Sequence, residues 1–154
     1  MRKGKIIVVI INTISKPMQL GFYENGLLVK QKEYEGLTSD ILLPLLYDLL
    51  KKYNIKSFIY TNGPGSHMAT KITYVLLKTL NIIKGIDFKA VSAFDLNGSK
   101  PIKALGKIYF VKEKENIITK KFDNILDSSF YMPKSLDEIE ILDSIEPNYN
   151  IAAV

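Results

Sequence analysis

The stretch Ile6–Ile11, with the sequence IIVVII, decides how the rest of the chain is interpreted. Six consecutive β-branched residues are typical of a strand buried on both faces of a sheet. A second strand is predicted over Met18–Tyr23, and Asn25-Gly26 is the pair that a two-residue hairpin turn prefers. A third strand is predicted over Leu27–Tyr34. The three segments therefore predict an antiparallel meander with its most apolar strand at the centre.

After this meander the spacing of apolar residues changes from strand-like to helix-like. A helix is predicted over Ile41–Tyr53, with Thr38, Ser39 and Asp40 as candidate N-caps and Pro44 near its first turn. The other predicted elements are a strand over Ser57–Thr61, a helix from the capping Ser66 to about Leu80, a strand over Phe88–Val91 and a short helix over Ala93–Leu96. Parallel strands joined through helices need right-handed crossovers. The order predicts an α/β fold of the ribonuclease-H-like type (actin-like ATPase superfamily), a mixed sheet with flanking helices.

The charge of the chain divides it into unequal parts. We expect residues 1–95 to form the ribonuclease-H-like N-terminal lobe, and residues 96–154 to form a reduced C-terminal lobe with an acidic tail. Residues 96–121 hold seven lysines against two glutamates, whereas residues 122–154 hold seven acidic residues and one lysine. A hairpin is predicted from Lys107–Lys112 and Asn116–Phe122, which turn around Glu113-Lys114-Glu115. One helical stretch is predicted in the tail, over Ser135–Ile145. The lysine surplus indicates either a coding bias or a surface that faces phosphates.

The amino-acid composition excludes several kinds of catalytic and metal-binding site. The 154 residues include no cysteine and one histidine, His67, which excludes disulfides, thiol nucleophiles and multi-histidine metal sites. The apolar run at the start is too short for a signal peptide, and no apolar stretch approaches the length of a membrane span. We therefore expect a cytoplasmic protein without membrane contact.

The first predicted helix has more apolar residues than one sheet face can cover. Between Ile41 and Leu50 only Asp48 is polar, whereas a helix lying on a sheet needs a single apolar stripe. We predict that this helix and the next form a partner interface, the alternative being that the acidic tail covers them. The predicted interface residues are Ile41, Leu42, Leu45, Leu46, Leu49, Ile72, Val75 and Leu76.

Few residues are candidates for catalysis. The loop Gly63-Pro64-Gly65-Ser66 precedes a helix, where backbone N–H groups can bind phosphate, although a tight turn with a capping serine is the simpler interpretation. Asn12 follows the first strand, where ribonuclease-H-like and actin-like enzymes carry a metal-binding aspartate, and a neutral amide is a poor substitute. We predict no catalytic residue, no metal site and no cofactor, and regard the glycine loop as a degenerate phosphate-type loop.

Five short motifs occur in a fixed order along the chain. They are Ile10-Ile11-Asn12-Thr13, Thr38-Ser39-Asp40-Ile41-Leu42-Leu43-Pro44, Gly63-Pro64-Gly65-Ser66 with Lys71-Ile72, Val91-Ser92-Ala93-Phe94-Asp95 and Glu146-Pro147-Asn148-Tyr149. Together they resemble the TsaB (YeaZ) family, whose motifs read I-D-T-S, H-S-E-x-L-L-P, GPGS-F-T-G-x-R-I-G, V-S-S-L-D and P-x-Y. Asn12, Thr38, His67 and Lys71 depart from these motifs, so the resemblance is to a divergent and shortened member.

The resemblance implies a function as well as a fold. It implies a non-catalytic subunit that pairs, through first-lobe helices, with a TsaD-type transferase making N6-threonylcarbamoyladenosine in tRNA. It also implies a TsaE-type ATPase in the larger complex, a homodimer through the same helices, and indirect contact with tRNA. Two alternatives stay open: a small actin-like ATPase or phosphate-binding enzyme that uses the glycine loop, and direct tRNA binding by the lysine-rich stretch 100–121.

Overall fold

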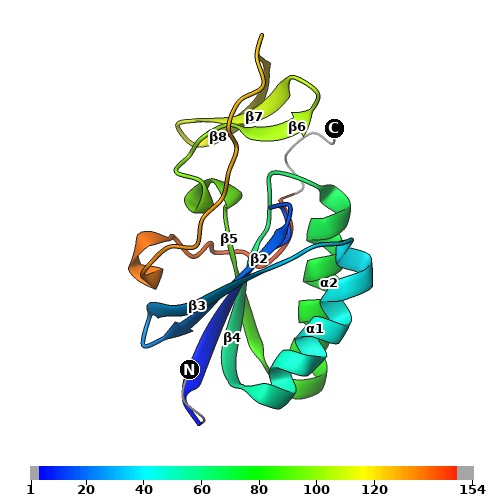
Figure 1. Ribbon diagram of the computed structural model, residues 1–154, viewed down its shortest axis with the longest axis vertical. Helices are drawn as coiled ribbons and strands as arrows, with labels where there is room; N and C mark the ends of the chain where they lie inside the picture. The colour runs from blue at the N-terminus through cyan, green and yellow to red at the C-terminus, as the bar shows by residue number, and fades with distance from the viewer. Residues whose placement is uncertain (1–3, 149–154) are drawn as a thin grey trace.

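The computed structural model describes residues 4–148, which form two β-sheets, with both long helices on the larger one (Figure 1). The larger sheet has the order β3-β2-β1-β4-β5 and the smaller has the order β6-β7-β8. The strands are β1 (Ile6–Asn12), β2 (Met18–Glu24), β3 (Leu27–Tyr34), β4 (Asn54–Thr61), β5 (Asp87–Val91), β6 (Ile102–Leu105), β7 (Ile108–Glu113) and β8 (Asn116–Lys121). The helices are α1 (Thr38–Lys52) and α2 (His67–Lys84), with short 3-10 turns η1 (Ala93–Leu96) and η2 (Leu136–Glu138).

The predicted meander is confirmed. β1 pairs antiparallel with β2, β2 pairs antiparallel with β3, and β1 also pairs parallel with β4. Asn25 and Gly26 both have positive φ, at 50° and 78°, as the tight hairpin turn requires. β1 therefore lies at the centre of a mixed α/β sheet, where its unbroken apolar run is buried.

The two faces of the larger sheet are covered differently. On one face Ile7, Val9 and Ile11 pack against both α1 and α2, which lie side by side (Figure 1). On the other face Ile10 packs with Tyr23 and with residues from the end of the chain. Because successive side chains of a strand point to opposite faces, β1 contributes to both cores.

The second face is covered by residues 130–148, which we call the belt. At the β3 side, the Leu28 N–H donates to the Lys134 carbonyl at 2.9 Å, and the Tyr23 hydroxyl donates to the Pro133 carbonyl at 2.7 Å. At the opposite edge, Ile141 forms an isolated bridge with Val91 of β5. The belt thus crosses the sheet from one edge strand to the other.

The helix predicted over Ser135–Ile145 is wrong. Only Leu136–Glu138 is helical, as one 3-10 turn with a capping box on Ser135. The backbone around this turn bonds to the sheet instead: the Leu136 N–H donates to the Gly26 carbonyl, and the Leu142 N–H donates to the Ala90 carbonyl. These long-range partners replace the local bonds that a helix would make.

The ends of the long helices also differ from the prediction. Leu37 is the N-cap of α1 and makes no side-chain cap hydrogen bond, so the predicted caps Thr38, Ser39 and Asp40 already belong to the helix. Pro44 lies inside α1, beyond its first turn. α2 continues to Lys84 and ends where Gly85 adopts a left-handed conformation, with φ 69°. Within residues 4–148, no helix is both long enough and apolar enough to cross a bilayer.

Candidate functional site: the outer helix face and the cleft between the sheets

Three of the predicted interface residues lie on the inner side of α1, facing the larger sheet. Leu42, Leu46 and Leu49 are 0%, 0% and 4% exposed, and all three pack in the core against the larger sheet. A partner cannot reach these leucines without unfolding α1 from the sheet. Their place in the predicted interface is therefore wrong.

Other predicted interface residues lie between the core and solvent. Ile41 and Leu45 of α1 are half-buried against the core, as are Ile72 and Leu76 of α2. Val75 is 50% exposed and points outward from α2. Of the predicted interface residues, Val75 has the side chain most available to a partner.

The exposed apolar residues on the outer sides of both helices form what we call the outer helix face. Its members are Leu43, Tyr47, Val75, Ile82 and Ile83, with exposed fractions of 55%, 60%, 50%, 73% and 71%. Fully burying one aliphatic side chain of this size contributes about 1.5 to 3 kcal/mol, so exposure of five residues is a large unused driving force. Exposed apolar side chains on two neighbouring helices make this side of the molecule a candidate protein interaction site, although Lys51 lies over the Tyr47 ring and Thr79 separates Val75 from Ile82.

Among the described residues, the acidic tail does not cover the outer helix face, as the alternative prediction required. The acidic tail was the candidate, but within residues 4–148 its belt packs on the opposite face of the sheet and wraps the β5 edge. Only Leu142 and Ile145 of the belt join the core beneath the helices. The interface therefore stays a prediction, with a corrected set of residues.

Sequence reasoning missed four of the five residues of the outer helix face. Leu43 and Tyr47 were counted as apolar but were not separated from the buried leucines beside them. Ile82 and Ile83 lie beyond the predicted helix end at Leu80. The Gly85 that ends α2 was the signal that could have extended the helix.

The glycine loop is held by close packing on both sides. Ser66 caps α2, as predicted, by accepting a hydrogen bond from the Ala69 N–H at 3.2 Å. Gly65 has φ 156°, and a Cβ there would lie 2.7 Å from Cγ2 of Ile14. The Gly63 carbonyl accepts a hydrogen bond from the Ala93 N–H at 2.9 Å. These contacts account for the glycines without a phosphate.

Asn12 is buried and turned inward at the end of β1. Its side-chain oxygen accepts three hydrogen bonds, from the Ile14 N–H at 3.0 Å, the Ser15 N–H at 3.2 Å and the Thr61 hydroxyl at 3.1 Å. The side chain is 0% exposed. The oxygen that would have to bind a cation is thus occupied in holding the turn after β1. The part of the chain that the structure describes holds no group of three or more His, Asp or Glu able to bind a metal ion.

A cleft of about 850 Å³ lies between the two sheets. It is lined by the turn after β1, the start of α2 and one side of the smaller sheet, including Lys16, Glu33, His67 and Lys103. His67 is exposed, and these four groups include a single carboxylate. The cleft can admit a small molecule, but it lacks the paired carboxylates that general acid–base catalysis uses.

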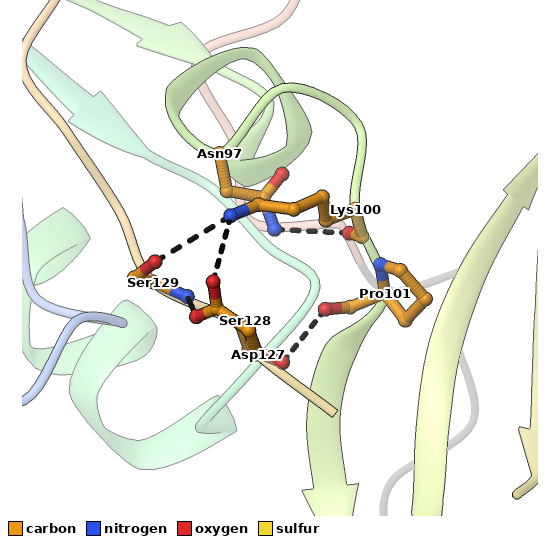
Figure 2. A network of polar contacts seen from close by, with 6 residues as sticks. All are labelled: Asn97, Lys100, Pro101, Asp127, Ser128 and Ser129. Atoms are coloured by element: carbon orange, nitrogen blue, oxygen red, sulfur yellow. Dashed lines mark hydrogen bonds and ion pairs between the residues drawn. The ribbon is translucent and has the colours of Figure 1, made fainter. Parts of the chain in front are cut away.

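Two segments connect the sheets, and they are bound to each other beside this cleft (Figure 2). Lys100 Nζ lies 3.3 Å from an Asp127 carboxylate oxygen, and the Ser128 hydroxyl donates to the Pro101 carbonyl at 2.7 Å. Hydrogen bonds from Ser129, followed by the Lys100 ammonium, hold the pKa of Asp127 below its usual range. An ion pair and a hydrogen bond thus hold the segment around Lys100 against the segment around Asp127 where both pass between the two sheets.

Comparison with solved structures identifies the fold. YeaZ from Pseudomonas aeruginosa superposes with a TM-score of 0.57 at 13% identity, over 96% of this chain and 70% of that chain.

The chain has the fold of YeaZ.

A second structure gives the same result. It is titled as an uncharacterized protein with similarity to peptidase YEAZ from Pseudomonas aeruginosa, and it matches with a TM-score of 0.51 at 16% identity. This match covers 96% of this chain and 69% of that chain. No protein-family model and no curated protein matches the sequence. The likeness to YeaZ therefore concerns the path of the backbone, and identity at single positions is low.

Proposed function

We propose that this chain is a divergent TsaB-type subunit that supports the synthesis of N6-threonylcarbamoyladenosine in tRNA. In this proposal the larger sheet and its helices are a ribonuclease-H-like lobe of the actin-like ATPase superfamily. The chain pairs with a TsaD-type transferase through the outer helix face, and a TsaE-type ATPase joins the complex. The observation that carries the proposal is the exposed apolar surface of α1 and α2 on a YeaZ fold.

The subunit itself is proposed to be non-catalytic. The support comes from Asn12, whose side-chain oxygen already accepts three hydrogen bonds inside the fold. An amide in that state offers neither the negative charge nor the free lone pairs that a divalent cation requires. In the proposal, the chemistry belongs to the partner.

The test is complex formation between the purified chain and its cognate TsaD-type protein, followed by size-exclusion chromatography. Val75→Asp and Ile82→Asp place a charge on exposed positions of α2, so the fold tolerates both changes. A charge buried without a partner costs about 3 to 5 kcal/mol, which weakens a complex by roughly a hundredfold to a few thousandfold. We expect both variants to elute without the transferase.

Val29→Asp is the matched control, because Val29 is 44% exposed on β3, away from the helices. It should bind the transferase like the unmodified chain. Normal binding by both α2 variants would remove the outer helix face from the proposal. The same columns report whether the chain alone is a homodimer, and whether the α2 variants convert it to a monomer.

The cleft of about 850 Å³ between the sheets supports a second candidate, a small actin-like ATPase or phosphate-binding enzyme. Its volume is within the range of small-molecule sites, and the glycine loop is on its wall. Calorimetric titration with Mg-ATP separates the two candidates. Tight binding that is lost in Ser66→Ala would favour the enzyme, and no heat of binding favours the subunit.

A further inference from the structure

Three asparagines of the chain are each followed by glycine, a pair in which the asparagine side chain can react with the neighbouring backbone nitrogen. The pairs are Asn25-Gly26, Asn62-Gly63 and Asn97-Gly98. The nitrogen of the glycine is open to reaction because glycine carries no Cβ beside it. The reaction also needs a side-chain amide that is free to turn and accessible to water. The structure therefore decides which of the three pairs can react.

Two of the three asparagines are buried, and hydrogen bonds hold their side-chain amides. Asn62 is 8% exposed, and its side-chain nitrogen donates to the Glu146 carbonyl at 3.2 Å. Asn97 is 0% exposed, and its side-chain nitrogen donates to the Lys100 carbonyl at 2.9 Å. Either amide can react only after a local opening that breaks this bond and admits water. The fold thus protects both pairs.

Asn25 differs from the other two, because it is at the exposed tip of the hairpin between β2 and β3. Within residues 4–148, no hydrogen bond holds its side-chain amide. The space beside Gly26 is also open, since a Cβ built there would meet no atom within 4 Å. Asn25-Gly26 therefore combines a free, hydrated amide with an unhindered backbone nitrogen.

The same turn anchors one end of the belt (Figure 1). The Gly26 carbonyl accepts a hydrogen bond from the Leu136 N–H at 2.8 Å, and Leu27 forms an isolated bridge with Ser135. The turn itself requires positive φ at Asn25 and Gly26. A change in the length of the main chain at Asn25 therefore displaces the carbonyl that holds Leu136.

We propose that Asn25 is a site of spontaneous modification, and that its isoaspartate product releases the Leu136 end of the belt. The Gly26 backbone nitrogen attacks Cγ of Asn25 and forms a new C–N bond. The bond from Cγ to the side-chain nitrogen breaks, and ammonia leaves with the proton that Gly26 loses. Water then opens the succinimide ring. Cleavage between the Gly26 nitrogen and Cγ gives aspartate, whereas cleavage between that nitrogen and the backbone carbonyl carbon gives isoaspartate.

The two products have different effects on the turn. Aspartate keeps the ordinary main chain, and Asp-Gly is itself a favoured pair for this turn. Isoaspartate carries the main chain through Cβ and Cγ, which lengthens the turn and moves the Gly26 carbonyl away from Leu136. The other end of the belt keeps its bond, from the Leu142 N–H to the Ala90 carbonyl at 2.9 Å. The modification therefore loosens one end of the belt and leaves the other attached.

The first experiment incubates the purified full chain at mildly alkaline pH and follows the three pairs by peptide mass spectrometry. Electron-transfer fragmentation distinguishes isoaspartate from aspartate. We expect Asn25 to convert at least about tenfold faster than Asn62 or Asn97, because an opening that breaks a buried hydrogen bond lowers the reactive population by roughly that factor. Absence of conversion at Asn25, or equal conversion at either buried asparagine, would overturn the assignment of the site.

The second experiment compares hydrogen exchange in the belt before and after incubation. The Leu136 amide should exchange roughly tenfold faster in chains that carry isoaspartate, because its hydrogen bond is lost, whereas exchange at Leu142 should be unchanged. Asn25→Gly is the matched control, since Gly-Gly also suits this turn and offers no side-chain amide. Incubation should leave its belt unchanged.

Two results would overturn the release of the belt. One is unchanged exchange at Leu136 in chains that carry isoaspartate, and the other is faster exchange at Leu136 in the incubated Asn25→Gly variant. Neither experiment contains a partner protein or tRNA, so both test the modification site independently of the proposed function.

Discussion

Replacing Asn12 with alanine tests whether this residue holds the fold or takes part in chemistry. The substitution removes the oxygen that accepts hydrogen bonds from the Ile14 N–H, the Ser15 N–H and the Thr61 hydroxyl. It leaves the two backbone donors behind in the turn after β1. The hydroxyl of Thr61 can rotate, but the amides cannot turn without moving the chain.

The cost follows from those lost partners. Each buried donor left unpaired costs about 1 to 3 kcal/mol. The Asn12 side-chain nitrogen is itself buried without a hydrogen-bond partner, and its removal offsets about 1 kcal/mol. The net expectation is a loss of about 3 kcal/mol in the free energy of unfolding, equivalent to roughly 6 to 12 °C in Tm for a chain of this size.

The assay is urea unfolding followed by far-ultraviolet circular dichroism, because the chain contains no tryptophan. Asn124→Ala, at an exposed position, is the control and should stay within about 0.5 kcal/mol of the unmodified chain. A loss below about 1 kcal/mol for Asn12→Ala would refute the argument from its three hydrogen bonds. Unchanged stability together with loss of tRNA modification by the reconstituted complex would make Asn12 catalytic, against the proposal.

Two further substitutions test other contacts. Gly65→Ala places a Cβ 2.7 Å from Ile14 Cγ2 at φ 156° and should cost about 2 kcal/mol in a thermal melt. Gly106→Ala, at φ 56° with open space around it, should cost about 1 kcal/mol, and a reversed order would contradict the packing argument. Tyr23→Phe removes the bond to Pro133 and should lower the free energy of unfolding by about 1 kcal/mol at neutral pH. Burial, and to a lesser extent Glu138, raises the pKa of Tyr23, so this tyrosine stabilises the fold below pH about 10 and loses that contribution as the pH rises. The difference in urea unfolding between Tyr23→Phe and the unmodified chain should therefore narrow above pH about 10, and a constant difference would show that Tyr23 does not titrate as its burial requires.

The features of the fold that could be predicted are those set by residues close together in the sequence. The β-branched run of β1, the Asn25-Gly26 turn and the Ser66 cap each depend on neighbours in sequence, and all three are confirmed. The smaller sheet was predicted only as a hairpin, because β6 is a four-residue strand and the turn at Gly106 that joins it to β7 was not recognised. The order of the predicted elements and motifs was sufficient to predict a YeaZ-type fold.

The outer helix face was predictable in kind but not residue by residue. A helix that is apolar on all sides gives no stripe from which to separate Leu42 from Leu43, and only packing against β1 decides that Leu42 is inside. The belt could not be predicted for a related reason. Its hydrogen bonds join residues about a hundred positions apart, as between Leu28 and Lys134, and no local period reports such a pairing.

The belt also imposes an order of events during translation. About forty residues lie between the end of β5 and the belt, and at about 5 to 20 residues per second the ribosome needs roughly 2 to 8 seconds to add them. Throughout that interval the apolar face of the larger sheet that includes Ile10 and Ile59 lacks the belt, and Leu96 of η1 is the part of its cover that has already been made. The nascent protein thus passes through a state that is half-covered by α1 and α2, and during those seconds it is a substrate for chaperones and a hazard for aggregation.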